Sequence, residues 1–251
     1  MRFEPESHSY LRKFYELNGS KALFLFDIDG TLISPGKIAR KLFIEITTEL
    51  TGRKISLEFK HVAGFTDPLI LKEMLQRAGV NGEEMDETLV NFFPIYYKRL
   101  KERYINATEK KMFDEVKDII YELSVKKNIY LGLVTGNMKR SAMIKLSPFG
   151  IENYFGIGAF ASDDPDRNRL PPIAVSRAES IWNVKFDNDE VFVVGDTIHD
   201  VHCAVVNDYR AIGIARRDGD NEKSILRSAG ADWVFETLPS SSEFMAIANM
   251  N

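Results

Sequence analysis

Short apolar runs alternate with amphipathic segments along most of this chain. Residues 22–26 form an unbroken apolar run, too short for a helix core and typical of a strand buried on both faces. Similar runs occupy residues 129–134 and 191–194, and each of the three ends abruptly in small polar residues. Because parallel strands bring such ends to one edge of a sheet, we expect these polar side chains to meet in space.

The alternation is regular in the second half of the chain. It predicts helices at 113–125, 139–146, 173–182, 200–206 and 221–227, strands at 129–134, 155–160, 191–194, 211–214 and 233–235, and a final helix after residue 238. Strands that alternate with helices predict an α/β fold, a doubly wound parallel sheet with right-handed crossovers.

The segment after the first strand has a different pattern, with helical periodicity and no clear strand. Helices are predicted at 38–50, 67–76 and 86–102, the second with Thr66 or Asp67 as cap and Pro68 in its first turn. We expect a smaller helical domain over 35–109, inserted into a core domain of residues 1–34 and 110–251. A short amphipathic helix at 7–17 is expected to pack on the core.

The polar ends of the three buried runs carry the candidate chemistry. They are Asp27, Asp29, Gly30 and Thr31 after the first run, Thr135, Gly136 and Asn137 after the second, and Asp196 and Asp200 after the third. In isolation each is also an ordinary turn sequence. Two carboxylates about 4 Å apart repel by roughly 4 kcal/mol at an effective dielectric of about 20. Four carboxylates gathered in one place therefore need a nearby cation if all of them are to stay ionised. Oxygen ligands without a His or Cys cluster favour Mg²⁺.

The motif Asp27-Ile-Asp29-Gly-Thr, followed by Thr135-Gly-Asn and Gly195-Asp-xxx-Asp200, resembles the haloacid dehalogenase (HAD) superfamily, specifically its aspartate-dependent phosphatases. The resemblance implies a Rossmann-like core and a helical cap domain, as in phosphoglycolate-phosphatase-like members. Asp27 is then the nucleophile and Asp29 the acid and base, which favours phosphate esters over carbon–halogen bonds. The metal site implied by the family comprises Asp27, the carbonyl of Asp29 and Asp196, with Asp200 orienting waters or neighbouring groups.

The same resemblance implies the contacts to the phosphate. Thr135 donates a hydrogen bond, amides near Gly30 and Gly136 add others, and Thr31 and Asn137 complete the expected set. Thr66 belongs to it only if the loop at 64–68 faces the substrate, and the alternative is that this loop merely caps a helix.

A basic residue is also expected between the second and fourth motifs, and here the chain departs from the family. The usual Lys-Pro pair is absent, and Arg167 and Arg169 both occupy the region. An Arg-x-x-Leu pattern in part of the family points to Arg167, whereas a gapless count from the following helix points to Arg169. If neither serves, Lys72 or Arg99 of the cap is the next candidate.

Composition restricts the class of function. The 251 residues carry 33 basic and 37 acidic side chains, well interspersed, so no nucleic-acid or membrane surface is indicated. The single Cys203 suits a reducing compartment, and His199 and His202 lack the companions of a metal site. We expect a cytoplasmic monomer or homodimer that hydrolyses phosphate monoesters of a small metabolite through an aspartyl-phosphate. The alternatives are a phosphomutase of the same superfamily, similar to β-phosphoglucomutase, and a non-catalytic binding module.

Overall fold

The computed structural model describes residues 21–56, 58, 62–217 and 219–249. The helix predicted at 7–17 lies outside the described residues. No helix in these ranges is long and apolar enough to cross a bilayer.

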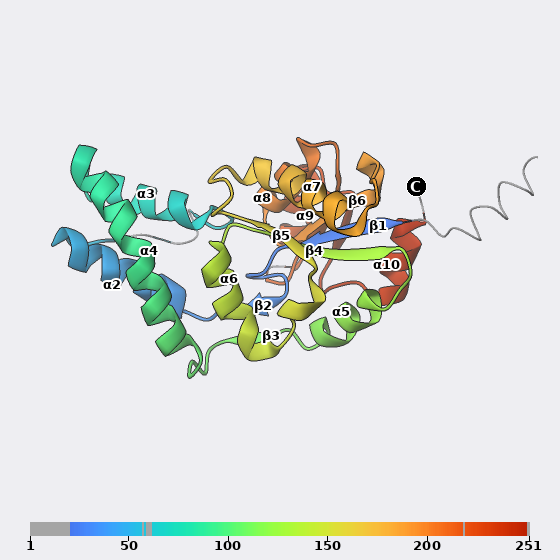
Figure 1. The fold of residues 1–251 in the computed structure, drawn as a ribbon, viewed down its shortest axis with the longest axis horizontal. Coiled ribbons are helices and arrows are strands. Elements are labelled where there is room, and N and C mark those ends of the chain that lie inside the picture. The colour runs from blue at the N-terminus through green and yellow to red at the C-terminus, as the bar shows by residue number, and fades with distance from the viewer. Residues whose placement is uncertain (1–20, 57, 59–61, 218, 250–251) are drawn as a thin grey trace, which may run out of the picture.

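A six-stranded parallel sheet forms the centre of the molecule, in the order β5-β4-β1-β6-β7-β8 (Figure 1). Its strands are β1 (Ala22–Phe26), β4 (Ile129–Thr135), β5 (Ile157–Phe160), β6 (Val191–Gly195), β7 (Arg210–Ile214) and β8 (Trp233–Phe235). Strand β1 pairs with β4 on one side and with β6 on the other. All five residues of β1 are buried, as its unbroken apolar sequence predicts.

Helices cover both faces of this sheet (Figure 1). They are α5 (Val116–Ser124), α6 (Lys139–Leu146), α7 (Leu170–Trp182), α8 (Ile198–Val205), α9 (Gly219–Ser228) and α10 (Ser241–Ala248). Buried residues of α5 and α10 share one hydrophobic core with β1, while α7 packs in a second core on the opposite side of that strand. The predicted doubly wound α/β fold is therefore confirmed.

Three helices that come between β1 and β4 along the chain form a separate group. They are α2 (Ile38–Thr51), α3 (Asp67–Arg77) and α4 (Gly82–Tyr104), and they enclose a hydrophobic core of their own around Phe92 and Tyr96. At the base of this group, β2 (Ile33–Ser34) and β3 (Lys111–Met112) pair as an antiparallel ribbon. The sequence did not predict this ribbon because a two-residue strand has no periodicity.

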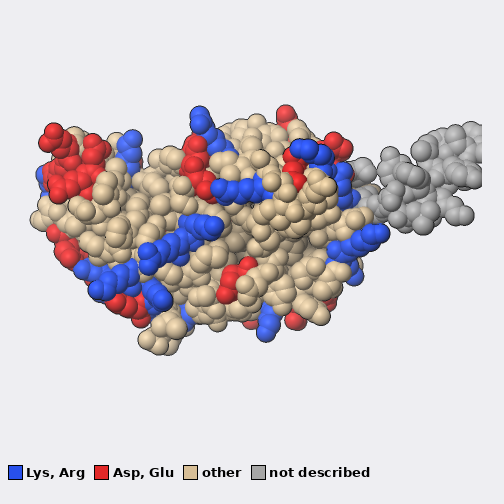
Figure 2. Space-filling view, in the orientation of Figure 1, with Lys and Arg blue, Asp and Glu red and all other residues tan. Residues whose placement is uncertain are grey.

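Acidic and basic side chains are mixed over the face shown in Figure 2, apart from an acidic group at the outer end of α4. The first turn of this helix carries Glu83 and Glu84. This distribution agrees with the balanced charge of the sequence.

Phe24 lies at the centre of the core, fully buried and within 4.9 Å, between ring centroids, of both Phe192 and Phe244. We expect Phe24→Ala to lower the free energy of unfolding by about 3–5 kcal/mol, because it removes a large side chain from a close-packed site. Urea denaturation followed by circular dichroism measures this change. Ile181→Ala, at a position 62% exposed on α7, is the control and should change stability by less than about 0.5 kcal/mol.

Candidate active site

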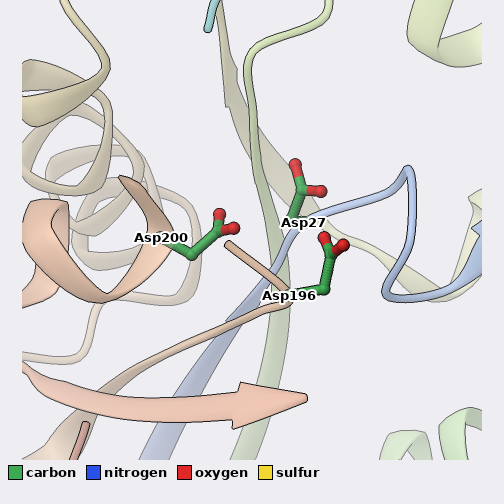
Figure 3. Close-up of side chains that lie close together, drawn as sticks. All are labelled: Asp27, Asp196 and Asp200. Carbon is green, nitrogen blue, oxygen red and sulfur yellow. The ribbon is translucent and has the colours of Figure 1, made fainter. Parts of the chain in front are cut away.

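Three buried carboxylates meet at the carboxyl edge of the sheet. Asp27 directly follows β1, Asp196 directly follows β6, and Asp200 lies in the first turn of α8. One oxygen from each lies within 4.8 Å of the other two. Figure 3 shows the three carboxylates gathered together, with Asp200 reaching toward the other two from its helix. The neighbouring positions of β1 and β6 in the sheet produce this arrangement.

The backbone around these acids leaves no space for larger residues. A Cβ atom at Gly195 would lie 2.1 Å from Cγ of Asp200, and one at Gly30 would lie 2.2 Å from Oδ2 of Asp196. Gly30 also has φ +93°, a conformation that favours glycine. Both glycines are therefore needed for the close approach of the chain to the carboxylates.

Arg167 joins two of the acids. Its Nη2 donates to Oδ1 of Asp27 at 2.9 Å and also to Oδ1 of Asp200, and its Nη1 donates to the carbonyl of Gly64 at 3.0 Å. Burial alone would lower the pKa of Arg167, but Asp200 and Asp27 outweigh that effect and raise it. The guanidinium is therefore a permanent positive charge within the cluster.

Arg169 lies elsewhere, although it is only two residues away. Its side chain is 71% exposed, and its nearest carboxylates are Asp164 at 3.6 Å and Asp166 at 4.0 Å. Of the two predicted arginines, only Arg167 contacts the acidic cluster. The two other candidate cations are not part of this cluster either: Arg99 pairs with Glu45 and Glu49, and Lys72 does not line the cavity described below.

Asp29 has a cation of its own, which sequence reasoning missed. Lys145 of α6 is only 3% exposed and donates to Oδ2 of Asp29 and to Oδ1 of Asn137. Asn137 in turn donates to Oδ2 of Asp29 at 3.1 Å and to the hydroxyl of Thr135 at 2.9 Å. The position of Lys145 in its helix could have indicated this contact, because Lys145 occupies the same buried face of α6 as Ser141 and Ala142.

Burial, with the crowding of the acids, raises the pKa values of two of them. Burial raises the pKa of Asp27 to about 7; Asp200 and Asp29 add to the rise, while Arg167 and a hydrogen bond from Thr135 oppose it. Burial, together with the charges of Asp200 and Asp27, also raises the pKa of Asp196 well above its usual range. A further cation in this cluster would favour the charged form of both groups.

The donor set fits a divalent metal ion. Oδ1 of Asp196 is buried without a hydrogen-bond partner among the described residues, whereas Oδ2 accepts from Arg217 at 2.7 Å. Asp27 adds a second carboxylate, and all candidate ligand atoms are oxygens, as Mg²⁺ prefers. Asp200 is less available, because Oδ1 accepts from Arg167 and Oδ2 accepts from the amide and hydroxyl of Thr197 at 3.0 and 2.7 Å.

A cavity of about 850 Å³, which includes space open to solvent, connects these groups with the α2–α4 helices. On the core side it is lined by Asp27, Asp29, Thr135, Gly136, Asn137, Lys145, Arg167 and Asp196. On the helical side Phe43, Ile70 and Tyr96 make it largely apolar. Among the described residues the hydroxyl of the buried Tyr96 has no hydrogen-bond partner.

The start of α3 is docked on the loop that follows β4. The amide of Asp67 donates to the carbonyl of Gly136 at 2.7 Å, and its carboxylate accepts from the amide of Met138 at 2.9 Å and the hydroxyl of Ser141 at 3.0 Å. A Cβ at Gly136 would lie 2.7 Å from the carbonyl oxygen of Phe65. The loop at 64–68 therefore does face the cavity, through Gly64 and Phe65.

Two of the predicted substrate contacts are placed differently. Thr66 is fully buried and donates its hydroxyl to the carbonyl of Pro165 at 2.8 Å, so it neither lines the cavity nor caps α3 with its side chain. Thr31 is fully buried as well and does not line the cavity. Neither threonine side chain lines this cavity, and the substrate contacts expected of Thr31 and Thr66 stay predictions.

His199 and Cys203 lie near the acids without joining them, and His202 is exposed on α8. His199 packs edge-on against Phe65, with 5.3 Å between ring centroids. Cys203 is fully buried in α8, and burial raises the pKa of its thiol to about 12. Neither belongs to the oxygen-ligand cluster.

Comparison with known proteins identifies the family to which this chain is related. The family model of haloacid dehalogenase-like hydrolases matches residues 24–214. The chain is 25% identical over 236 residues to the pyrophosphatase PpaX of Halalkalibacterium halodurans, covering 86% of this chain and 92% of that protein. It is 22% identical over 201 residues to the PpaX of Listeria welshimeri, covering 79% and 85%.

Solved structures share the fold at lower identity. A phosphonoacetaldehyde hydrolase-like protein from Oleispira antarctica superposes with a TM-score of 0.68 at 16% identity, covering 93% of this chain and 94% of that one. A predicted phosphoglycolate phosphatase from Haemophilus somnus gives 0.66 at 15% identity, covering 91% and 98%. The predicted family and the predicted phosphatase class are confirmed, and this chain belongs to the haloacid dehalogenase-like hydrolases.

Proposed function

We propose that this protein is a Mg²⁺-dependent hydrolase of small phosphate compounds that works through an aspartyl-phosphate on Asp27. The observation that carries the proposal is the position of Asp27 in the cavity, with Arg167 on its Oδ1 at 2.9 Å and Asp196 and Asp200 beside it. A carboxylate held in this way is a nucleophile aimed at an anionic electrophile.

In the first step, an oxygen of Asp27 attacks phosphorus and the bond from phosphorus to the leaving oxygen breaks. Arg167 and Thr135 stabilise the charge on the phosphoryl oxygens, because both line the cavity next to Asp27. The amide of Gly136, a residue that also lines the cavity, is a further proposed donor to these oxygens.

Asp29 supplies the proton to the leaving oxygen. Its Oδ2 is held by Lys145 and Asn137, whereas Oδ1 is buried without a partner among the described residues. The carboxyl group of Asp29 lines the cavity and gives up the proton there. In the second step the same carboxylate takes a proton from water as that water attacks phosphorus and releases Asp27.

Asp27, Asp196 and the carbonyl of Asp29 are the proposed Mg²⁺ ligands, with Asp200 acting mainly on Arg167 and on the start of α8. When bound, the ion offsets the charge between the nucleophile and the phosphoryl group. The pyrophosphatases among the relatives make pyrophosphate a substrate to test, beside 2-phosphoglycolate. The α2–α4 helices are the proposed cap over the site, and residues 35–109 are its proposed bounds.

Asp27→Asn should lower turnover by a factor on the order of 10³ or more, because it removes the nucleophile and a metal ligand together. A panel of phosphate compounds, assayed for released phosphate in ¹⁸O-labelled water, measures this and distinguishes hydrolysis from phosphoryl transfer to a sugar. Hydrolysis puts solvent oxygen into the released phosphate. A folded variant with near-normal turnover would contradict the proposed nucleophile.

Chelation with EDTA should stop turnover, and added Mg²⁺ should restore it. Asp196→Asn should raise the Mg²⁺ concentration for half-maximal turnover by about tenfold or more, since a charged ligand is lost. Calorimetric titration of Mg²⁺ into both proteins gives a readout independent of activity. Asp118→Asn, on the surface of α5, is the matched control and should leave both values unchanged. Full activity in metal-free buffer would disprove the metal assignment.

Arg167→Ala should lower turnover by about 10²–10³, because the buried guanidinium acts on the phosphoryl oxygens. Arg169→Ala should change it by less than about twofold, since an exposed charge is screened. Thermal unfolding shows whether loss of Arg167 also destabilises the fold. Arg167→Lys keeps the charge without the two-pronged contact and should give an intermediate turnover. The opposite ranking would assign the role to Arg169.

A further inference from the structure

A second cavity adjoins the first at the base of the α2–α4 helices. Its volume is about 1230 Å³, including space open to solvent, and its walls come from the β2–α2 connection, from β3 and from the segment after β7. Asp29, Arg40, Asp196 and Arg217 line both cavities. The residues proposed to act on the phosphoryl group line only the first cavity; they are Asp27, Thr135 and Arg167. The second cavity therefore adjoins the phosphoryl site without including it.

The second cavity is basic in a protein whose net charge is −4. Its lining includes Lys37, Arg40, Lys111, Arg216 and Arg217, against three acidic residues. Two of these three, Asp29 and Asp196, are already engaged by Lys145 and Arg217. The lining charges that remain are Lys37, Arg40, Lys111 and Arg216 against Glu109, and this excess of positive charge favours an anionic occupant.

Among the cations of the second cavity, Lys37 and Lys111 are the most available to a bound anion. Neither Lys37 nor Lys111 has a carboxylate partner for its ammonium group in the part of the chain that the structure describes. Lys111 lies over the ring of Phe113 at 5.7 Å from the centroid, and only the backbone amide of Lys37 bonds to Glu109, at 3.2 Å. Many other basic residues are paired, such as Arg99, Arg103 and Arg177.

The wall beside these lysines is firmly held. The guanidinium carbon of Arg216 lies 3.7 Å from the centroid of Phe113, and its Nη2 contacts Oε1 of Glu115 at 2.7 Å and the carbonyl of Thr31 at 2.9 Å. Arg217, 60% exposed, is anchored by Asp196 at 2.7 Å and Glu222 at 3.0 Å. The arginine wall of the basic recess is thus fixed by ion pairs, and the exposed Lys37 and Lys111 stand beside it.

Asp29 connects this recess to the chemistry. It faces both cavities, and under the function proposed above, on which this step rests, it gives its proton to the leaving oxygen. The leaving group therefore starts beside Asp29, at the mouth of the basic recess. We propose that the recess binds a second anionic group carried by the leaving group, so that the substrates are phosphate compounds with a phosphate or carboxylate close to the scissile bond.

A matched pair of substrates tests the proposal. 2-Phosphoglycolate carries a carboxylate where 2-hydroxyethyl phosphate carries a neutral hydroxymethyl group, and pyrophosphate provides the phosphate arm. We expect kcat/KM for 2-phosphoglycolate or pyrophosphate to exceed that for 2-hydroxyethyl phosphate by at least tenfold. In the double variant Lys37→Gln/Lys111→Gln this ratio should fall at least fivefold.

The double variant Lys126→Gln/Lys127→Gln is the control. It removes the same charge from the exposed turn before β4, at the opposite edge of the sheet, and should keep the wild-type ratio. A wild-type enzyme without preference for either anionic substrate would overturn the proposal, and so would a preference that Lys37→Gln/Lys111→Gln leaves unchanged.

A binding measurement separates this proposal from the proposed function. In an Asp27→Asn background, calorimetry with Mg²⁺ present should show that Lys37→Gln/Lys111→Gln weakens pyrophosphate binding at least tenfold and inorganic phosphate binding much less. Equal weakening of both, or of neither, overturns the recess as a second-anion site. Absence of hydrolysis for every compound, with this binding difference intact, would instead overturn only the proposed function.

Discussion

The burial of acids at one edge of the sheet is the constraint on which this site depends. Asp27, Asp196 and Asp200 are each at most 5% exposed and lie within 4.8 Å of one another. Unpaired charges in such a position are unstable, so the surrounding structure has to supply cations. It does so in separate places: Arg167 for Asp27 and Asp200, Arg217 for Asp196, and Lys145 for the neighbouring Asp29.

These cations come from distant parts of the chain, and they therefore tie the fold to the site. Lys145 belongs to α6, Arg167 to the turn before α7, and Arg217 to the segment after β7. Arg167 also reaches the carbonyl of Gly64 beside the α2–α4 helices. A correctly paired acidic cluster thus requires the central strands, the crossover helices and the helical insertion to be in place together.

The sequence predicted the elements with strong periodicity and the acids at their ends. The runs at 22–26 and 233–235 and the helix at 139–146 have the predicted bounds, because a buried strand and an amphipathic helix each leave a local pattern. The start of α8 was missed by two residues, since the capping box between Thr197 and Asp200 sets it. The ribbon of β2 and β3 depends on pairing between distant residues, which no local pattern records.

The basic partners of the site were harder to predict than the acids, for a physical reason. Strand ends place Asp27 and Asp196 by topology alone, whereas a long cationic side chain reaches its partner from a direction that only the packed structure defines. Arg167 and Arg169 lie in one 3-10 turn, yet this turn buries the first and exposes the second.

Lys145 is six residues after the predicted start of its helix and resembles a surface lysine until the buried face of α6 is known. Its contact with Asp29 leaves Oδ1 of that acid as the oxygen without a partner among the described residues. The position of one lysine therefore determines which oxygen of Asp29 is held in an ion pair.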